Sequence, residues 1–141
     1  MQRRATAVWE GGLKDGKGRL TTGSHALADT PYSFHTRFES EPGTNPEELI
    51  GAAHAGCFSM ALSLQLGEAG IRPERIETRA TITFEKLDTG FTITRSHLDV
   101  SVRAPGADRA QFERAAQNAK AGCPISKVLK AEISMDARLE T

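Results

Sequence analysis

The fold of this chain is decided by residues 45–68, which read NPEELIGAAHAGCFSMALSLQLGE. The stretch predicts one long helix that Asn45 caps and Pro46 begins, because both residue types are favoured at those positions. Gly70 is expected to stop the helix after about Glu68. Apolar residues wrap most of its circumference: Leu49, Ile50, Ala53, Cys57, Phe58, Met60, Ala61, Leu62, Leu64 and Leu66. A helix that is apolar all round needs cover on every side, and a chain of 141 residues rarely supplies it, so we expect a second subunit to pack there.

The segments around this helix predict an α+β fold. Strand patterns occupy residues 3–10, 18–23, 32–38, 76–85, 91–103 and 133–139. Helix patterns occupy residues 108–121 and 123–130. The apolar parity changes near Arg95–His97, which indicates either a bulge or a sheet face that changes partners there. Because most strands are joined as hairpins, we expect antiparallel sheets packed on long central apolar helices, in a single domain covering residues 1–141.

Composition narrows the class of protein. Lys+Arg and Asp+Glu both number 18, so the net charge is zero, and neither nucleic acid nor a membrane surface is an expected partner. No apolar stretch follows Arg3 and Arg4, so we expect a cytoplasmic protein with reduced thiols. The longest apolar stretch runs from Leu49 to Leu66, and because the polar residues His54 and Gln65 interrupt it, we interpret it as part of a core helix instead of a membrane span.

The chemistry is expected at two cysteines, which are too few for a disulfide scaffold. Cys57 and Cys123 each follow an Ala-Gly pair, which leaves room for a close approach to each sulfur. Cys123 begins a short helix, whose dipole favours a thiolate. Cys57 lies mid-helix among apolar residues, so its pKa should be raised unless a cation such as Arg37 compensates. The plainer alternative is that both cysteines are buried and act as small hydrophobic residues.

Glu47 is a candidate carboxylate partner for Arg37. It lies ten residues before Cys57, or roughly 15 Å along a straight helix, so it cannot reach that sulfur within its own helix. If two copies of the helix crossed antiparallel at a two-fold axis, Glu47 of one subunit could meet Cys57 of the other. The expected dimer would then also assemble the site.

His54 lies three residues before Cys57, on nearly the same helix face. A Cys–His dyad for acyl transfer would use such a pair, although dyad partners usually come from different elements. A satisfied core histidine is the simpler interpretation. The four histidines, at positions 25, 35, 54 and 97, have no tight spacing, so no metal site is predicted from them.

Several runs of this sequence are similar to a known family. They are TNPEELIGAAHAGCFSMAL at residues 44–62, KAGCPIS at 120–126, WEG at 9–11 and TRFE at 36–39. Together they resemble the OsmC/Ohr family of organic hydroperoxide reductases, and the last two place the chain nearer the OsmC branch. The resemblance implies an intertwined homodimer with active sites at the interface. It also implies a thiol peroxidase without a metal or other cofactor.

By this resemblance Cys57 is the peroxidatic thiol and Cys123 the resolving thiol, with Arg37 and Glu47 around the reactive sulfur. The implied substrates are organic hydroperoxides, and the implied reductant is a dithiol carried on a lipoylated protein. An apolar pocket would favour organic over hydrogen peroxide, and its expected aromatic lining is Phe34, Phe38 and Phe58. One alternative stays open: a redox sensor or small-molecule binding protein that uses the same cysteines without turnover.

Overall fold

The computed structural model describes all 141 residues, and the chain forms two compact units, Met1–Leu49 and Ile50–Thr141. The elements follow the order β-β-β-α-α-β-β-α-α-β. Mixed helices and strands of this kind confirm the α+β class. A single domain over residues 1–141 stays a prediction.

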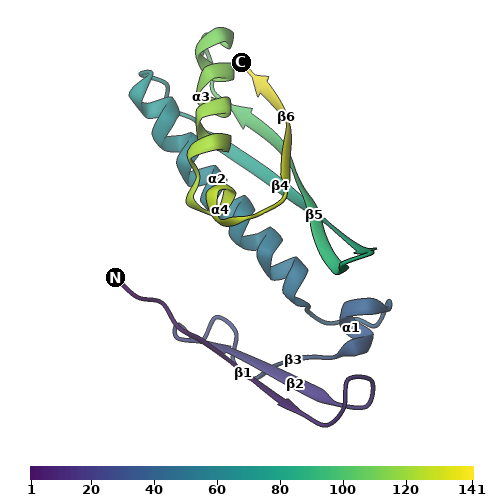
Figure 1. The fold of residues 1–141 in the computed structure, drawn as a ribbon. Coiled ribbons are helices and arrows are strands. Elements are labelled where there is room, and N and C mark those ends of the chain that lie inside the picture. The colour runs from purple at the N-terminus through teal and green to yellow at the C-terminus, as the bar shows by residue number, and fades with distance from the viewer. The chain divides into compact units, whose positions relative to one another are not determined.

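The first unit contains a three-stranded antiparallel meander (Figure 1). Its strands are β1 (Ala5–Glu10), β2 (Lys17–Thr22) and β3 (Thr30–Tyr32). The register pairs Ala5 with Thr22 and Glu10 with Lys17. The hairpin expected from residues 3–10 and 18–23 is therefore confirmed.

The strand predicted for residues 32–38 is wrong, because residues Phe34–Phe38 form a short helix, α1. Ser33 caps it: the Ser33 side chain accepts a hydrogen bond from the Thr36 backbone, and the Thr36 hydroxyl accepts one from the Ser33 backbone. The alternating pattern misled because it also sets Phe34 and Phe38 four residues apart, which is helical spacing. Their ring centroids lie 4.9 Å apart.

The long helix α2 (Pro46–Glu68) begins and ends as the sequence predicts. The backbone N–H of Glu48 donates to Asn45 Oδ1 at 2.8 Å, which is an N-cap hydrogen bond. Gly70 follows the last turn with a φ of +75°, a left-handed conformation that favours glycine. The helix starts in the first unit and continues into the second.

The second unit is built on a three-stranded sheet of order β4-β5-β6. Its strands are β4 (Arg75–Leu87), β5 (Gly90–Arg103) and β6 (Glu132–Glu140). Pairing of β4 with β5 is antiparallel and shifts register where Thr83 faces Arg95 and Phe84 faces Ile93. The extra residue, Thr94, is the bulge that the parity change indicated.

One strand pair departs from the expected antiparallel sheets, because β6 runs parallel to β5. Helices α3 (Arg109–Gly122) and α4 (Pro124–Val128) carry the chain back along β5, so that β6 begins opposite Arg95. A connection of this length permits parallel pairing, which a hairpin does not.

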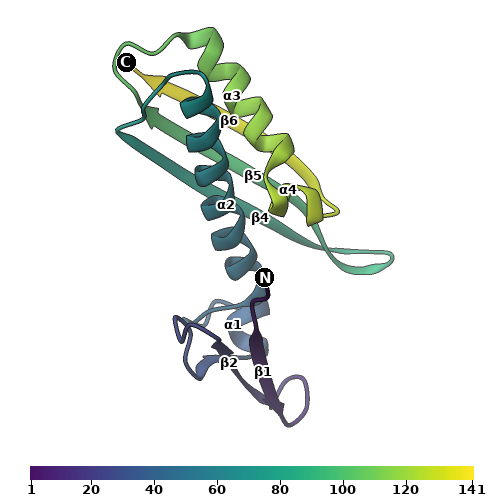
Figure 2. The ribbon, with the colours of Figure 1, turned by 90° about the vertical axis from the view of Figure 1, so that its left-hand side faces the viewer.

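Helices α2 and α3 cover one face of this sheet, as the two views show (Figures 1 and 2). The buried apolar core between them comprises Phe58, Leu62, Leu66, Leu98, Val100, Val102, Ala104, Phe112, Ala115, Ala116, Ala119 and Cys123. Another side of α2 stays uncovered in the chain, since Met60 is 78% and Leu64 62% exposed. By length and composition α2 could also cross a membrane, but its buried residues pack in this core as those of a core helix do.

Candidate active site

The second unit brings the two cysteines together. Cys57 projects from α2, and Cys123 lies at the junction where α3 ends and α4 begins. The Cys123 thiol donates a hydrogen bond to Cys57 Sγ across 2.7 Å, and both thiols are free. Cys123 is fully buried, whereas Cys57 is partly exposed. An external reagent therefore meets Cys57 first, with Cys123 directly behind it.

Cys57 borders a cavity of about 460 Å³. The other residues that line it are Met60, Ala61, Leu64, Gln65, Asn118, Ala119, Gly122 and Pro124. None of them carries a charge, and the surface is mostly apolar. The cavity can accommodate an organic molecule beside the sulfur, but it supplies no cation from its own walls.

The pKa of the Cys57 thiol is raised, first because burial disfavours the charged form and second because the Cys123 thiol is its hydrogen-bond partner. The backbone N–H of Ile125 in α4 opposes this and lowers the pKa. The raised pKa of Cys57 agrees with the expectation for a mid-helix cysteine in apolar surroundings. A cation from elsewhere is needed to make Cys57 a thiolate near neutral pH.

The first unit brings Arg37 and Glu47 together. Arg37 projects from α1 and donates from Nε at 3.1 Å and from Nη2 at 2.8 Å to Glu47 Oε1. Glu47 stands in the first turn of α2, where the helix dipole favours a carboxylate, and it is 8% exposed. Because two guanidinium nitrogens donate to this one carboxylate oxygen, Arg37 is held in one orientation.

The three aromatic residues expected around a pocket lie in two different units of the chain. Phe34 and Phe38 lie on α1, and the Arg37 guanidinium carbon is 5.2 Å from the centre of the Phe38 ring. Phe58, in contrast, is fully buried in the core of the second unit and is not among the residues that line the cavity at Cys57. Its helix position explains this, because it follows Cys57 by one residue and points to a different side.

His54 is a satisfied core histidine. It is fully buried, with Nδ1 2.6 Å from Ser96 Oγ and Nε2 2.8 Å from Ser126 Oγ. Both ring nitrogens contact hydroxyls and neither contacts a thiol, which disfavours the Cys–His dyad. Ser126 belongs to α4, so His54 ties the helix that follows Cys123 to α2 and β5.

Sequence reasoning missed Ser96 and Ser126 as partners of His54. One signal was available: Ser96 is the polar member of the buried series on β5 that continues with Leu98, Val100 and Val102. A hydroxyl at a core position implies a buried polar partner, because an unsatisfied polar group is costly there.

We expect His54 to make the protein less stable in mild acid. Burial lowers the pKa of His54 in the folded chain. Below pH about 6.5, His54 therefore becomes protonated in the unfolded chain while it stays neutral in the folded chain. The stability contributed above that pH is therefore lost as pH falls through the lower folded pKa. Urea unfolding at pH 7 and 5.5 should show this loss in the wild type and a smaller one in His54→Gln. At pH 7 the substitution should cost about 1–3 kcal/mol, because it leaves a serine hydroxyl unpaired.

His35→Gln is the control, because the hydrogen bond to Glu39 raises the pKa of His35. That group contributes stability below its unfolded pKa, which is lost as pH rises, so its removal should not reduce the acid sensitivity. An equal pH response in His54→Gln and in the wild type would contradict the assignment.

The fold and the paired thiols define an α+β protein with a dithiol site. The family model described as OsmC-like protein matches residues 38–138 of the chain. Peroxiredoxin OsmC of Escherichia coli (strain K12) is 55% identical over 141 residues, which cover 100% of this chain and 99% of that protein. Organic hydroperoxide resistance protein OhrB of Bacillus subtilis (strain 168) is 31% identical over 124 residues, which cover 87% of this chain and 88% of that one.

Solved structures agree with the fold. An OsmC-like protein of unknown function from Vibrio cholerae superposes with a TM-score of 0.77 at 16% identity and covers 98% of this chain and 99% of its own. An OsmC-like protein from Mycoplasma pneumoniae gives a TM-score of 0.77 at 14% identity, with coverage of 100% and 99%. The chain belongs to the OsmC-like family, which confirms the resemblance that its motifs carried.

Proposed function

We propose that this protein is a thiol-dependent peroxidase that reduces organic hydroperoxides, and hydrogen peroxide less well. The single observation that carries the proposal is the pair of free thiols 2.7 Å apart, one accessible and one buried, beside an apolar cavity. The relatives support it, since one is named a peroxiredoxin and another an organic hydroperoxide resistance protein.

The reaction uses both thiols in turn. The Cys57 thiolate attacks one peroxide oxygen, the O–O bond breaks, and the leaving alkoxide takes a proton to become an alcohol. Cys57 is now a sulfenic acid. Cys123 attacks that sulfur, water leaves, and a Cys57–Cys123 disulfide forms. An external dithiol then reduces the disulfide, so that each cycle consumes one peroxide and one dithiol and yields an alcohol, water and an external disulfide.

Arg37 and Glu47 are proposed to activate Cys57. The pKa of Cys57 is raised and the cavity beside it has no charged wall, so the thiolate needs a cation. Arg37 is a suitable cation because Glu47 fixes its orientation. We propose that this pair comes from the second subunit of a homodimer, in which the exposed side of α2 with Met60 and Leu64 is covered.

The preference for organic peroxides is proposed to come from apolar contacts near the sulfur. Met60, Ala61 and Leu64 line the cavity beside Cys57. Each buried methylene of a substrate contributes roughly 0.8 kcal/mol, so an alkyl hydroperoxide gains affinity that hydrogen peroxide cannot. Phe34 and Phe38 belong to the same proposal as pocket residues supplied with Arg37.

The proposed reductant is a dithiol carried on a lipoylated protein, and the proposed compartment is the cytoplasm, where thiols are kept reduced. Both proposals follow from the family resemblance and from the need to reopen a disulfide whose Cys123 sulfur is buried. A small or flexible dithiol reaches the exposed Cys57 sulfur more readily than a bulky one does.

Steady-state turnover separates the peroxidase from the redox sensor. The purified protein is mixed with dihydrolipoamide and excess cumene hydroperoxide, and alcohol is measured over time. A peroxidase produces many equivalents of cumyl alcohol per Cys57. Formation of one equivalent followed by arrest, with the disulfide resistant to dihydrolipoamide, glutathione and thioredoxin alike, would identify a sensor and reject turnover.

A further inference from the structure

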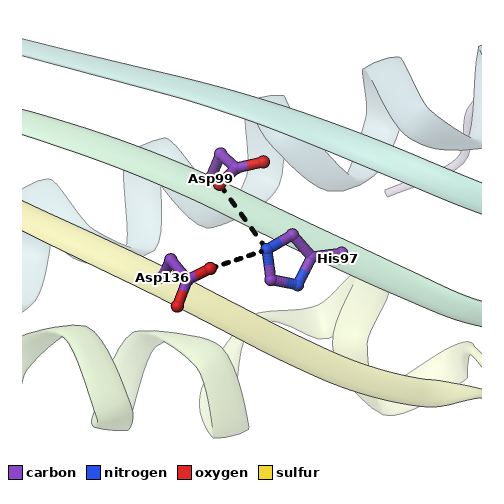
Figure 3. A group of neighbouring side chains, drawn as sticks. All are labelled: His97, Asp99 and Asp136. Carbon is purple, nitrogen blue, oxygen red and sulfur yellow. Dashed lines mark ion pairs between the residues drawn. The ribbon is translucent and has the colours of Figure 1, made fainter.

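The sheet of the second unit has an uncovered face on which three side chains converge. His97 and Asp99 lie two residues apart on β5, and Asp136 lies on β6 as the register partner of Asp99. His97 Nε2 is 3.2 Å from Asp136 Oδ2 and 3.5 Å from Asp99 Oδ1 (Figure 3). The three candidate ligand atoms all lie within 4.8 Å of one another. They therefore surround one point in space.

Two carboxylates at this position need a cation. Like charges directly opposite on neighbouring strands destabilise a sheet, and Asp99 and Asp136 are such a pair. Arg79 on β4 is the register partner of Asp99 on the other side, but no ion pair joins them. The nitrogen that does reach both carboxylates is His97 Nε2.

A serine hydroxyl on the other ring nitrogen orients the imidazole of His97. His97 Nδ1 lies 2.6 Å from Ser134 Oγ, and Ser134 is the register partner of His97 on β6. When Nδ1–H donates to this hydroxyl, the Nε2 lone pair points at the space between the two carboxylates. Metal-binding histidines commonly have such an outer partner on the other nitrogen.

The spacing of the three atoms also suits a metal ion. Ligands at about 2.0–2.2 Å around a tetrahedral zinc ion lie about 3.3–3.6 Å from one another. The two histidine–carboxylate separations of 3.2 and 3.5 Å are close to those values. One imidazole nitrogen and two carboxylate oxygens form a donor set that first-row divalent metals accept, and water can complete it because Asp136 is largely exposed.

We propose that His97, Asp99 and Asp136 form a binding site for a divalent transition-metal ion of the zinc type. The site is separate from the thiols, because His97 and Asp99 face away from the core into which Leu98 and Val100 point. It does not depend on the proposed peroxidase activity, whose chemistry needs no metal. It also departs from the expectation of a metal-free chain, because the third ligand, Asp136, comes from a different strand, β6, which the spacing of the histidines could not reveal.

Zinc titration tests the site. The Cys57→Ser/Cys123→Ser variant removes the thiols as competing ligands, and calorimetry with Zn²⁺ should then find one equivalent bound. Adding Asp136→Asn or His97→Gln should weaken binding by about tenfold or more, since even outer-shell losses have that effect. Asp136 is exposed, so Asp136→Asn should leave the fold intact, which circular dichroism checks.

The matched control is His35→Gln. His35 also forms an ion pair with a carboxylate, but with a single one, Glu39, and it lies in the first unit. This control should bind zinc like its parent. Absence of zinc binding at millimolar concentration, or binding that His97→Gln and Asp136→Asn leave unchanged, would overturn the proposal and leave His97 as the cation of an ordinary ion-pair cluster.

Discussion

Replacing Cys57 with serine will abolish the consumption of cumene hydroperoxide, down to the rate of the dithiol alone. A serine hydroxyl is a poor nucleophile at neutral pH and cannot be oxidised to a sulfenic acid, so both the first and second steps are lost. The substitution changes one atom in a partly exposed position, and the fold should be retained. The measurement is the loss of peroxide over time with dihydrolipoamide as reductant.

Cys123→Ser is the matched variant, and we expect it to lose the second step of the cycle instead of the first. It should consume one equivalent of peroxide per Cys57 and then stall, because no thiol remains 2.7 Å away to form the disulfide. The trapped sulfenic acid should react with dimedone and be found by mass spectrometry. Full steady-state turnover in Cys57→Ser would reject the mechanism, and an unaffected Cys123→Ser would remove the resolving role of Cys123.

Replacing Arg37 with alanine should slow the first step strongly and move its pH profile. Burial raises the pKa of Cys57, and an opposite charge nearby lowers such a pKa by about 1–3 units. Without Arg37, the pH at which the first turnover reaches half its maximal rate should therefore rise by about 1–3 units. Stopped-flow measurement of peroxide loss from pH 5 to 10 gives this value. Arg19→Ala is the control, because Arg19 pairs with Glu10 in the same unit and has no proposed role.

A mixture of the inactive Cys57→Ser and the slowed Arg37→Ala, assayed at neutral pH, tests which subunit supplies Arg37 to each Cys57. Cys57→Ser and Arg37→Ala are unfolded together and refolded, so that mixed dimers form. If Arg37 serves the Cys57 of the other subunit, each mixed dimer contains one complete site, and the mixture recovers about one quarter of wild-type activity. If Arg37 serves its own subunit, every site lacks one residue and the mixture shows no activity beyond that of its Arg37→Ala chains, which would contradict the shared site. Glu47→Gln in place of Arg37→Ala should complement in the same way.

Much of the local structure could be predicted because its causes are local. Asn45, Pro46 and Gly70 set the ends of α2 through capping and backbone conformation, and Asp108 likewise caps α3. Residues 32–38 were mispredicted for an equally local reason, since a capping box at Ser33 outweighed an alternating pattern. The parallel pairing of β6 was not visible, because pairing direction depends on where two helices return the chain.

The candidate site, too, has features that the sequence predicts and features that only the tertiary structure decides. Sequence alone identified two cysteines in matching motifs as the candidate site, and it predicted the raised pKa of Cys57, because residue type and helix position decide that pKa. Only the tertiary structure decided that Cys123 lies 2.7 Å from Cys57, that His54 is held by two serines, and that Asp136 joins His97 and Asp99. These contacts join segments between 37 and 72 residues apart, and packing of helices on the sheet, not spacing along the chain, sets such distances.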